Sequence, residues 1–180
     1  KDGYRFVKTK IESVYSCLGI TCADVGELLD SNGMPYPGME KCLDVADSIT
    51  EDTTWSTTVI LLGQVFVQPE VTLTIMPGLT VQSEVIDSSG SAPALVVLPG
   101  AMLMAEGTAD APITFTSTAT DQELPSVGLW GGLIIMGNAP VYGGTQLVEG
   151  LDGYSYGGSN STESSGTLKY VRVWYGGRVL

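Results

Sequence analysis

The sequence predicts an all-β fold, a parallel β-helix (solenoid) preceded by a small N-terminal extension of helices and loops. The main observation is a short pattern written twice, in which Leu73-x-Ile75-x-Pro77-Gly78 recurs as Leu95-x-Val97-x-Pro99-Gly100, 22 residues later. Another short apolar strand follows each Pro-Gly pair, as expected at the corner of a coil. A repeat of this length cannot bury its own apolar face and needs stacked neighbours, so we interpret the two copies as successive coils of the solenoid. The composition agrees, because 43% hydrophobic and 16% charged residues exclude a disordered chain.

Residues 1–47 form a separate, cysteine-containing extension that we interpret as a cap or an assembly segment. Apolar residues at helical spacing predict a helix near its start, and they are Val7, Ile11, Val14 and Leu18. All the cysteines of the chain lie here, at Cys17, Cys22 and Cys42. With no histidine and no fourth thiol, a tetrahedral zinc site is incomplete, so we favour a disulfide between two of the three.

The solenoid is predicted over residues 48–180, with strands separated by corners and polar loops. The expected strands are 57–62, 64–67, 71–75, 80–82, 95–97, 102–104, 113–116, 130–137 and 168–175. Residues 143–166 are rich in Gly, Ser and Tyr and are interpreted as a long insertion. The chain stops in or just after the last strand, so we expect either a fragment or an end that stacks on another subunit.

The charge distribution argues against several classes of partner. The net charge is −12, and no Lys, Arg or His occurs from Cys42 to Leu168. Nucleic acid is therefore excluded, because its binding depends on Lys and Arg neutralising phosphates. No apolar run approaches the ~18–20 residues that a membrane-spanning helix needs.

Several segments together resemble a family of secreted right-handed β-helix surface proteins of the Bacteroidetes type, mostly uncharacterised. The resemblance covers about residues 48–180 and is carried by TLTIMPGLTV, GAMLMAEGTADAPITFTS, LWGGLIIMGNAPV, VEG and GTLKYVRVWYGG. It implies a right-handed coil, an extracellular or cell-surface location, and further coils after the last strand, relative to which this chain is truncated. It supplies no agreed catalytic site.

The residues argue against an enzyme. A polysaccharide lyase of β-helical shape needs a basic proton abstractor, and a hydrolase needs two facing carboxylates. The only cations near the solenoid's end are Lys169, Arg172 and Arg178, and no Asp-Asp pair occurs. We expect no catalytic residues, and a polysaccharide lyase or hydrolase stays as the least favoured reading.

No cofactor is expected, although the sequence leaves calcium binding open. Glu149, Asp152 and Glu163 lie in the loop-rich stretch before the last strand, where carboxylates would suit calcium. Their spacing matches no known calcium loop, so we favour solvated surface charge. Asn160 begins the glycosylation sequon Asn160-Ser161-Thr162.

The last strand offers a candidate sugar-binding surface. If Val171 and Val173 point inward, Tyr170, Arg172 and Trp174 share the outer face, where rings beside a guanidinium would stack on sugars. The sequence favours the alternative that these rings pack under the loop 151–165. Trp55 and Trp130 are predicted to be core residues.

These observations favour a structural role. Stacked coils leave unpaired backbone groups at both ends, and such edges invite another chain. The leading hypothesis is a building block of an extracellular filament or surface assembly, polymerising head to tail through the β-helix ends and the N-terminal segment. The alternative is a carbohydrate-binding or adhesive surface module.

Overall fold

The computed structural model describes residues 43–46, 48–85, 91–119 and 127–180. This part of the chain consists of strands, turns and loops without a helix. The strands are β1 (Leu43–Val45), β2 (Thr53–Trp55), β3 (Val59–Leu61), β4 (Gln64–Val67), β5 (Thr72–Ile75), β6 (Thr80–Ser83), β7 (Ala94–Val97), β8 (Met102–Glu106), β9 (Ile113–Ser117), β10 (Gly132–Ile135), β11 (Gln146–Leu147), β12 (Ser155–Tyr156), β13 (Gly166–Lys169) and β14 (Val171–Val173).

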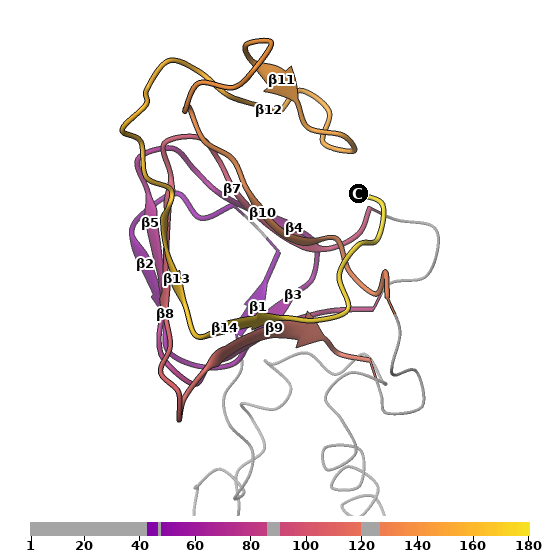
Figure 1. The fold of residues 1–180 in the computed structure, drawn as a ribbon. Coiled ribbons are helices and arrows are strands. Elements are labelled where there is room, and N and C mark those ends of the chain that lie inside the picture. Colours follow the sequence, from indigo (N-terminus) through magenta and orange to yellow (C-terminus); the bar gives the residue numbers. More distant parts are fainter. Residues whose placement is uncertain (1–42, 47, 86–90, 120–126) are drawn as a thin grey trace, which may run out of the picture.

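Three parallel sheets form the walls of a right-handed β-helix (Figure 1). Sheet I has the order β1-β3-β6-β9-β14, sheet II the order β4-β7-β10, and sheet III the order β2-β5-β8-β13. The chain visits the three sheets in turn, so that each complete coil contributes one strand to each. The predicted fold class is confirmed.

Alternating side chains explain why these segments form strands around a common core. In β4, β5 and β6 every second residue is buried, and β9 shows the same alternation. The buried members lie in register from coil to coil, as Leu73 does with Leu103 and Val81 with Phe115. Each such side chain contributes about 1.5–3 kcal/mol on burial. Trp55 and Trp130 belong to this core, as predicted.

The duplicated Pro-Gly pattern marks two different corners of the coil. Pro77-Gly78 joins β5 to β6, whereas Pro99-Gly100 joins β7 to β8. Leu73 therefore pairs with Leu103, and not with Leu95 as successive 22-residue coils would require. The expectation that the two copies stack directly on each other was wrong, because loops of unequal length separate the strands.

The corner that stacks below Pro99-Gly100 is Pro69-Glu70. The Glu70 amide donates a hydrogen bond to the Gly100 carbonyl oxygen, 3.0 Å away. Both Glu70 and Gly100 have positive φ, at 67° and 83°. This backbone conformation favours glycine, so the glutamate at position 70 gave no sequence signal that the two corners share a turn geometry.

The segment between β10 and β13, residues 136–165, is the insertion, and it folds over the outer face of sheet II. Met136 and Leu151 are buried there against β7, and the Phe66 and Tyr154 rings stack with centroids 4.8 Å apart. The short antiparallel pair β11–β12 lies within it. The long insertion predicted over residues 143–166 is thus confirmed, although it begins earlier, at Met136, and it gives sheet II a second apolar layer.

At the N-terminal side, β1 pairs with β3 and adds a strand to sheet I before the boundary predicted at residue 48. The predicted helix of the extension and Cys17, Cys22 and Cys42 lie outside the described residues. Within the described ranges, no helix has the length and apolar character needed to cross a bilayer.

Candidate functional site

The last coil does not contain one continuous strand over 168–175. Tyr170, with φ of 49°, forms a corner between β13 and β14, and its carbonyl oxygen accepts a hydrogen bond from the Ile113 amide at 3.0 Å. The corner moves the chain from sheet III to sheet I. Val171 then packs against the core, so the predicted inward direction of this valine is confirmed.

Arg172 and Trp174 lie together on the outer side of the coil. The Arg172 guanidinium carbon is 5.8 Å from the centroid of the Trp174 ring, within the range of a cation–π interaction. Tyr175 extends this group, with its ring centroid 6.2 Å from that of Trp174 and tilted by 58°. Trp174 is held in place through its backbone, because its carbonyl oxygen accepts a hydrogen bond from Trp130 Nε1 at 2.7 Å.

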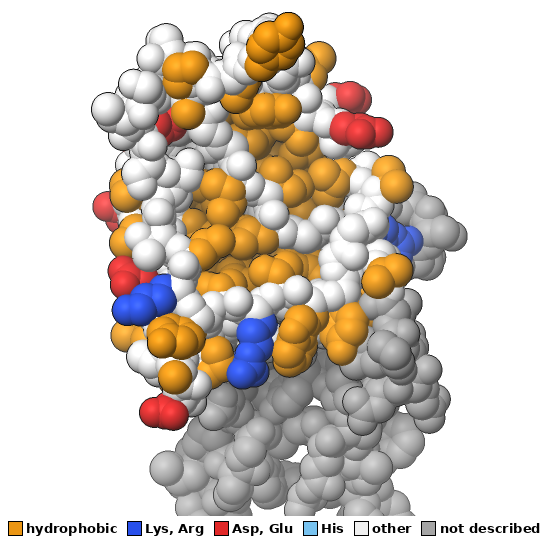
Figure 2. All heavy atoms as spheres, viewed as in Figure 1, with side chains coloured by type: hydrophobic (Ala, Val, Ile, Leu, Met, Phe, Trp, Pro, Cys, Tyr) orange, Lys and Arg blue, Asp and Glu red, His pale blue; other side chains and the backbone are white. Residues whose placement is uncertain are grey.

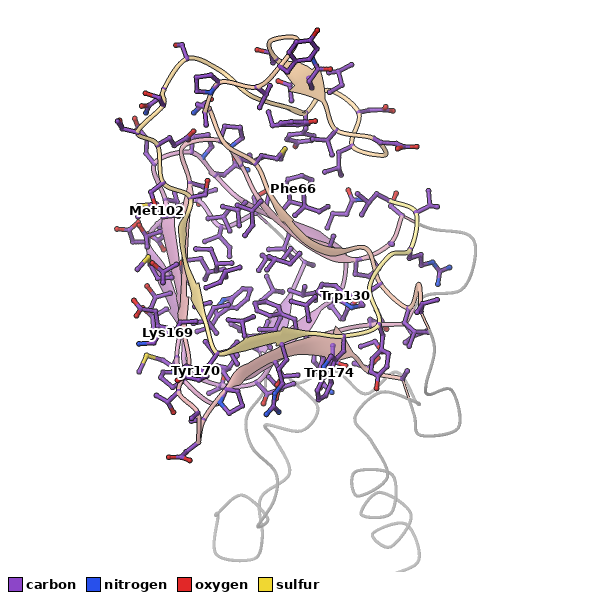
Figure 3. All side chains as sticks on the ribbon, viewed as in Figure 1. Phe66, Met102, Trp130, Lys169, Tyr170 and Trp174 are labelled. Atoms are coloured by element: carbon purple, nitrogen blue, oxygen red, sulfur yellow. The ribbon has the colours of Figure 1, made fainter. Side chains whose placement is uncertain are left out.

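The expectation that these rings pack under the loop 151–165 was wrong. Tyr170 is 54% exposed and Trp174 is 45% exposed. Figure 3 shows Trp174 outside the coil and Trp130 inside it, whereas the insertion covers a different wall, near Phe66. The physical reason is the corner at Tyr170, which turns β14 onto sheet I and away from the insertion on sheet II.

Glu163, one of the three calcium candidates, binds backbone and amide N–H groups. Its carboxylate accepts hydrogen bonds from the Gly100 amide at 2.9 Å, from Asn138 Nδ2 at 3.0 Å and from the Asn138 amide. Glu149 and Asp152 are exposed on the insertion. Among the described residues, no group of three or more acidic, histidine or cysteine side chains is placed to hold a metal.

Asn160 lies exposed in the insertion within a local turn. Its Oδ1 accepts hydrogen bonds from the Thr162 amide at 3.1 Å and from Thr162 Oγ1 at 3.0 Å. The asparagine and the threonine of the sequon are therefore in contact, and the asparagine is exposed. Its glycosylation stays a prediction.

The end of the solenoid formed by β10, β13 and β14 is the tail end, and it exposes side chains that are interior elsewhere. Leu168 is 49% exposed, although Ala105 and Ile75 beneath it are buried. Val173 and Ile135 are likewise 48% and 40% exposed above buried partners. Figure 2 looks onto this end and shows apolar side chains across the middle of the coil.

Sequence reasoning missed the Glu163 contacts and the corner at Tyr170. The hydrogen bond from the Gly100 amide to Glu163 joins residues that are 63 positions apart in the sequence, so no local sequence pattern predicts it. Tyr170 has a positive φ without being Gly, Asn or Asp, the residues that usually signal such a corner.

Comparison with known proteins identifies a family and no individual relative. Residues 47–180 match the family model described as a pectate-lyase-like beta helix domain. No curated protein and no solved structure matches the chain.

Proposed function

The chain belongs to the pectate-lyase-like beta helix domain family, and we propose that it is a structural building block of an extracellular filament or cell-surface assembly. The units join head to tail through the ends of the solenoid, with the N-terminal segment taking part in the contact. The proposal concerns a structural role and not catalysis.

The tail end is the observation that supports this role most. Its edge strands β10, β13 and β14 present backbone groups along one side, and such edges readily pair with another chain. Between them lie the half-exposed side chains of Leu168, Val173 and Ile135. Covering this end would bury apolar surface and pair backbone groups in one step.

A pair of variants on β13 tests the proposal. Leu168 points into the coil at the tail end, and its neighbour Thr167 points outward. We expect the wild type and Thr167→Glu to form rods in electron micrographs, and Leu168→Glu to remain monomeric, because its carboxylate would be buried at the contact.

Circular dichroism of both variants checks that the coil is still folded, which the half-exposed position of Leu168 favours. A wild-type chain that stays a monodisperse monomer at high concentration would contradict the proposal.

A carbohydrate-binding or adhesive module is the second candidate, supported by the exposed Arg172–Trp174 pair. An aromatic face beside a guanidinium offers stacking and hydrogen bonding to a sugar ring. Trp174→Ala should abolish binding on a glycan array. The matched control is Tyr142→Ala, which removes a fully exposed ring on the insertion and should leave binding unchanged. Absence of binding by the wild type would remove this candidate.

We propose neither a catalytic role nor a cofactor. The support is the shortage of candidate bases, because Lys169, Arg172 and Arg178 are the only Lys, Arg or His residues in the described ranges. A polysaccharide lyase or hydrolase is therefore the least favoured reading. A calcium-dependent release of unsaturated or reducing ends from an acidic polysaccharide would make a lyase or hydrolase the favoured hypothesis.

A further inference from the structure

The methionines in the described ranges differ sharply in their accessibility. Met76 and Met102 are 45% and 36% exposed, and Met104 is partly exposed. Met136, in contrast, is 3% exposed, because it lies among the apolar side chains between sheet II and the insertion. The three accessible thioethers all belong to one wall of the coil.

This wall is the outer face of sheet III. Along β8 the buried residues Leu103 and Ala105 alternate with Met102, Met104 and Glu106, so both methionines point away from the core. Figure 3 shows the Met102 side chain on the outer side of this wall. The two methionine side chains of β8 therefore do not fill the core.

Met76 follows β5 on the same face. Ile75 before it is 2% exposed and faces the core, so the next side chain turns outward. The Met76 amide donates a hydrogen bond to the Trp55 carbonyl oxygen at 3.0 Å, and the Met102 amide donates one to the Val71 carbonyl oxygen at 2.9 Å. Each of these residues is thus held by its main chain, while its side chain is left in contact with solvent.

The exposure of Met76 and Met102 does not come from an open end of the coil. Strands β5 and β8 are the two inner strands of sheet III, with β2 on one side and β13 on the other. Both neighbouring strands belong to the described residues, so the two methionines lie in the body of the solenoid.

The other outward positions on the strands of sheet III are polar. They are Thr54 on β2, Thr72 and Thr74 on β5, Glu106 on β8, and Thr167 and Lys169 on β13. Within the described strands, the three methionines therefore supply the apolar surface of this face.

We propose that the outer face of sheet III is an oxidant-sensitive modification site, at which hydroperoxides convert Met76 and Met102, and more slowly Met104, to methionine sulfoxide. A thioether is apolar, whereas a sulfoxide is polar. Oxidation therefore makes the whole face polar and leaves the side chains of the core unchanged. The site does not depend on the assembly proposed above.

The reaction needs the hydroperoxide alone. The sulfur lone pair attacks the terminal peroxide oxygen, the O–O bond breaks and an S–O bond forms. The proton of the transferred oxygen passes to the leaving oxygen, which departs as an alcohol or, from hydrogen peroxide, as water. The sulfur is oxidised and the peroxide is reduced, so electrons and atoms balance.

Peptide mapping by mass spectrometry tests the site after the folded protein has been exposed to limiting hydrogen peroxide. We expect Met76 and Met102 to gain one oxygen about tenfold faster than Met136, in proportion to their exposed fractions. In denaturant the three rates should become equal. Cleavage after glutamate residues places Met76 and Met136 in separate peptides, and fragmentation separates Met102 from Met104.

The matched control is the triple variant Met76→Leu, Met102→Leu and Met104→Leu, because leucine keeps the apolar volume and has no sulfur. Oxidation should shorten the retention of the wild type on a hydrophobic-interaction column, with the circular dichroism unchanged. The triple variant should lose most of this shift, and Met34 and Met39, which lie outside the described residues, account for any remainder. Methionine sulfoxide reductases should restore the retention of the wild type.

Three results would overturn the proposal. The first is oxidation of Met76 and Met102 at the rate of Met136 in the folded protein, whether all are fast or all are protected. The second is a retention shift that the triple variant keeps in full. The third is loss of the strand signal in circular dichroism as Met76 and Met102 are oxidised, which would make these side chains part of what holds the coil together.

Discussion

The Glu163 carboxylate fastens the end of the insertion to two corners of the solenoid. One of its oxygens accepts from the Gly100 amide and from Asn138 Nδ2, and the other accepts from the Asn138 amide. Gly100 and Asn138 follow β7 and β10, so a single side chain ties together two coils and the loop that covers them. Hydrogen bonds to an ionised group are stronger than those between neutral groups.

Glu163→Ala should therefore destabilise the fold by about 2–3 kcal/mol, because it leaves these N–H groups without their acceptor. The free energy of unfolding from urea denaturation measures the effect. Glu149→Ala is the matched control, since it removes an exposed carboxylate from the same insertion and should change stability by less than about 0.5 kcal/mol. Equal stabilities of the two variants would contradict the role given to Glu163.

At the scale of the element, the insertion behaves as an outer layer on sheet II. Its residues Met136, Leu151 and Tyr154 pack on the side chains that point outward from β4, β7 and β10. The Phe66–Tyr154 stack, with an interplanar angle of 16°, is the aromatic contact of this layer. A strand pair as short as β11–β12 is not stable alone, so the packing holds it.

Tyr154→Ala should loosen the insertion while leaving the coil folded. Removing one ring of a stacked pair costs about 0.5–1.5 kcal/mol beyond the lost burial. Limited proteolysis should show faster cleavage within residues 136–165, with the fragment containing β3 to β9 still resistant. Tyr142→Ala, in the same segment but fully exposed, should be cleaved at the wild-type rate. If both variants are cleaved alike, the stack does not hold the layer.

At the scale of the whole molecule, the sequence predicted the solenoid because its determinants are local. Alternation in segments such as 72–75 and 113–117 forces one face inward wherever the strand lies. Coil register is not local, since it depends on the loop lengths between strands. This is why two similar Pro-Gly corners were assigned to the same place in successive coils.

The candidate site was predictable only in part, for the same reason. The inward direction of Val171 followed from alternation, and so did the shared outer face of Arg172 and Trp174. Which wall the insertion covers was decided by contacts of Phe66, Met136 and Glu163 across the coil. The corner at Tyr170 then placed Trp174 on a different wall. Those contacts join distant residues, so the exposure of Trp174 was predicted wrongly.

Both faces of β7 are buried, and this limits the amino-acid substitutions that the strand can accept. All four of its residues, Ala94, Leu95, Val96 and Val97, have no exposed surface, because the core lies on one side and the insertion on the other. Strands such as β5 and β6 keep a partly exposed outer face, which carries threonine and glutamine side chains. On β7 no position can accept a polar residue. If the insertion were lost, the outward residues Ala94 and Val96 would become exposed, and we would expect them to be replaced by polar residues.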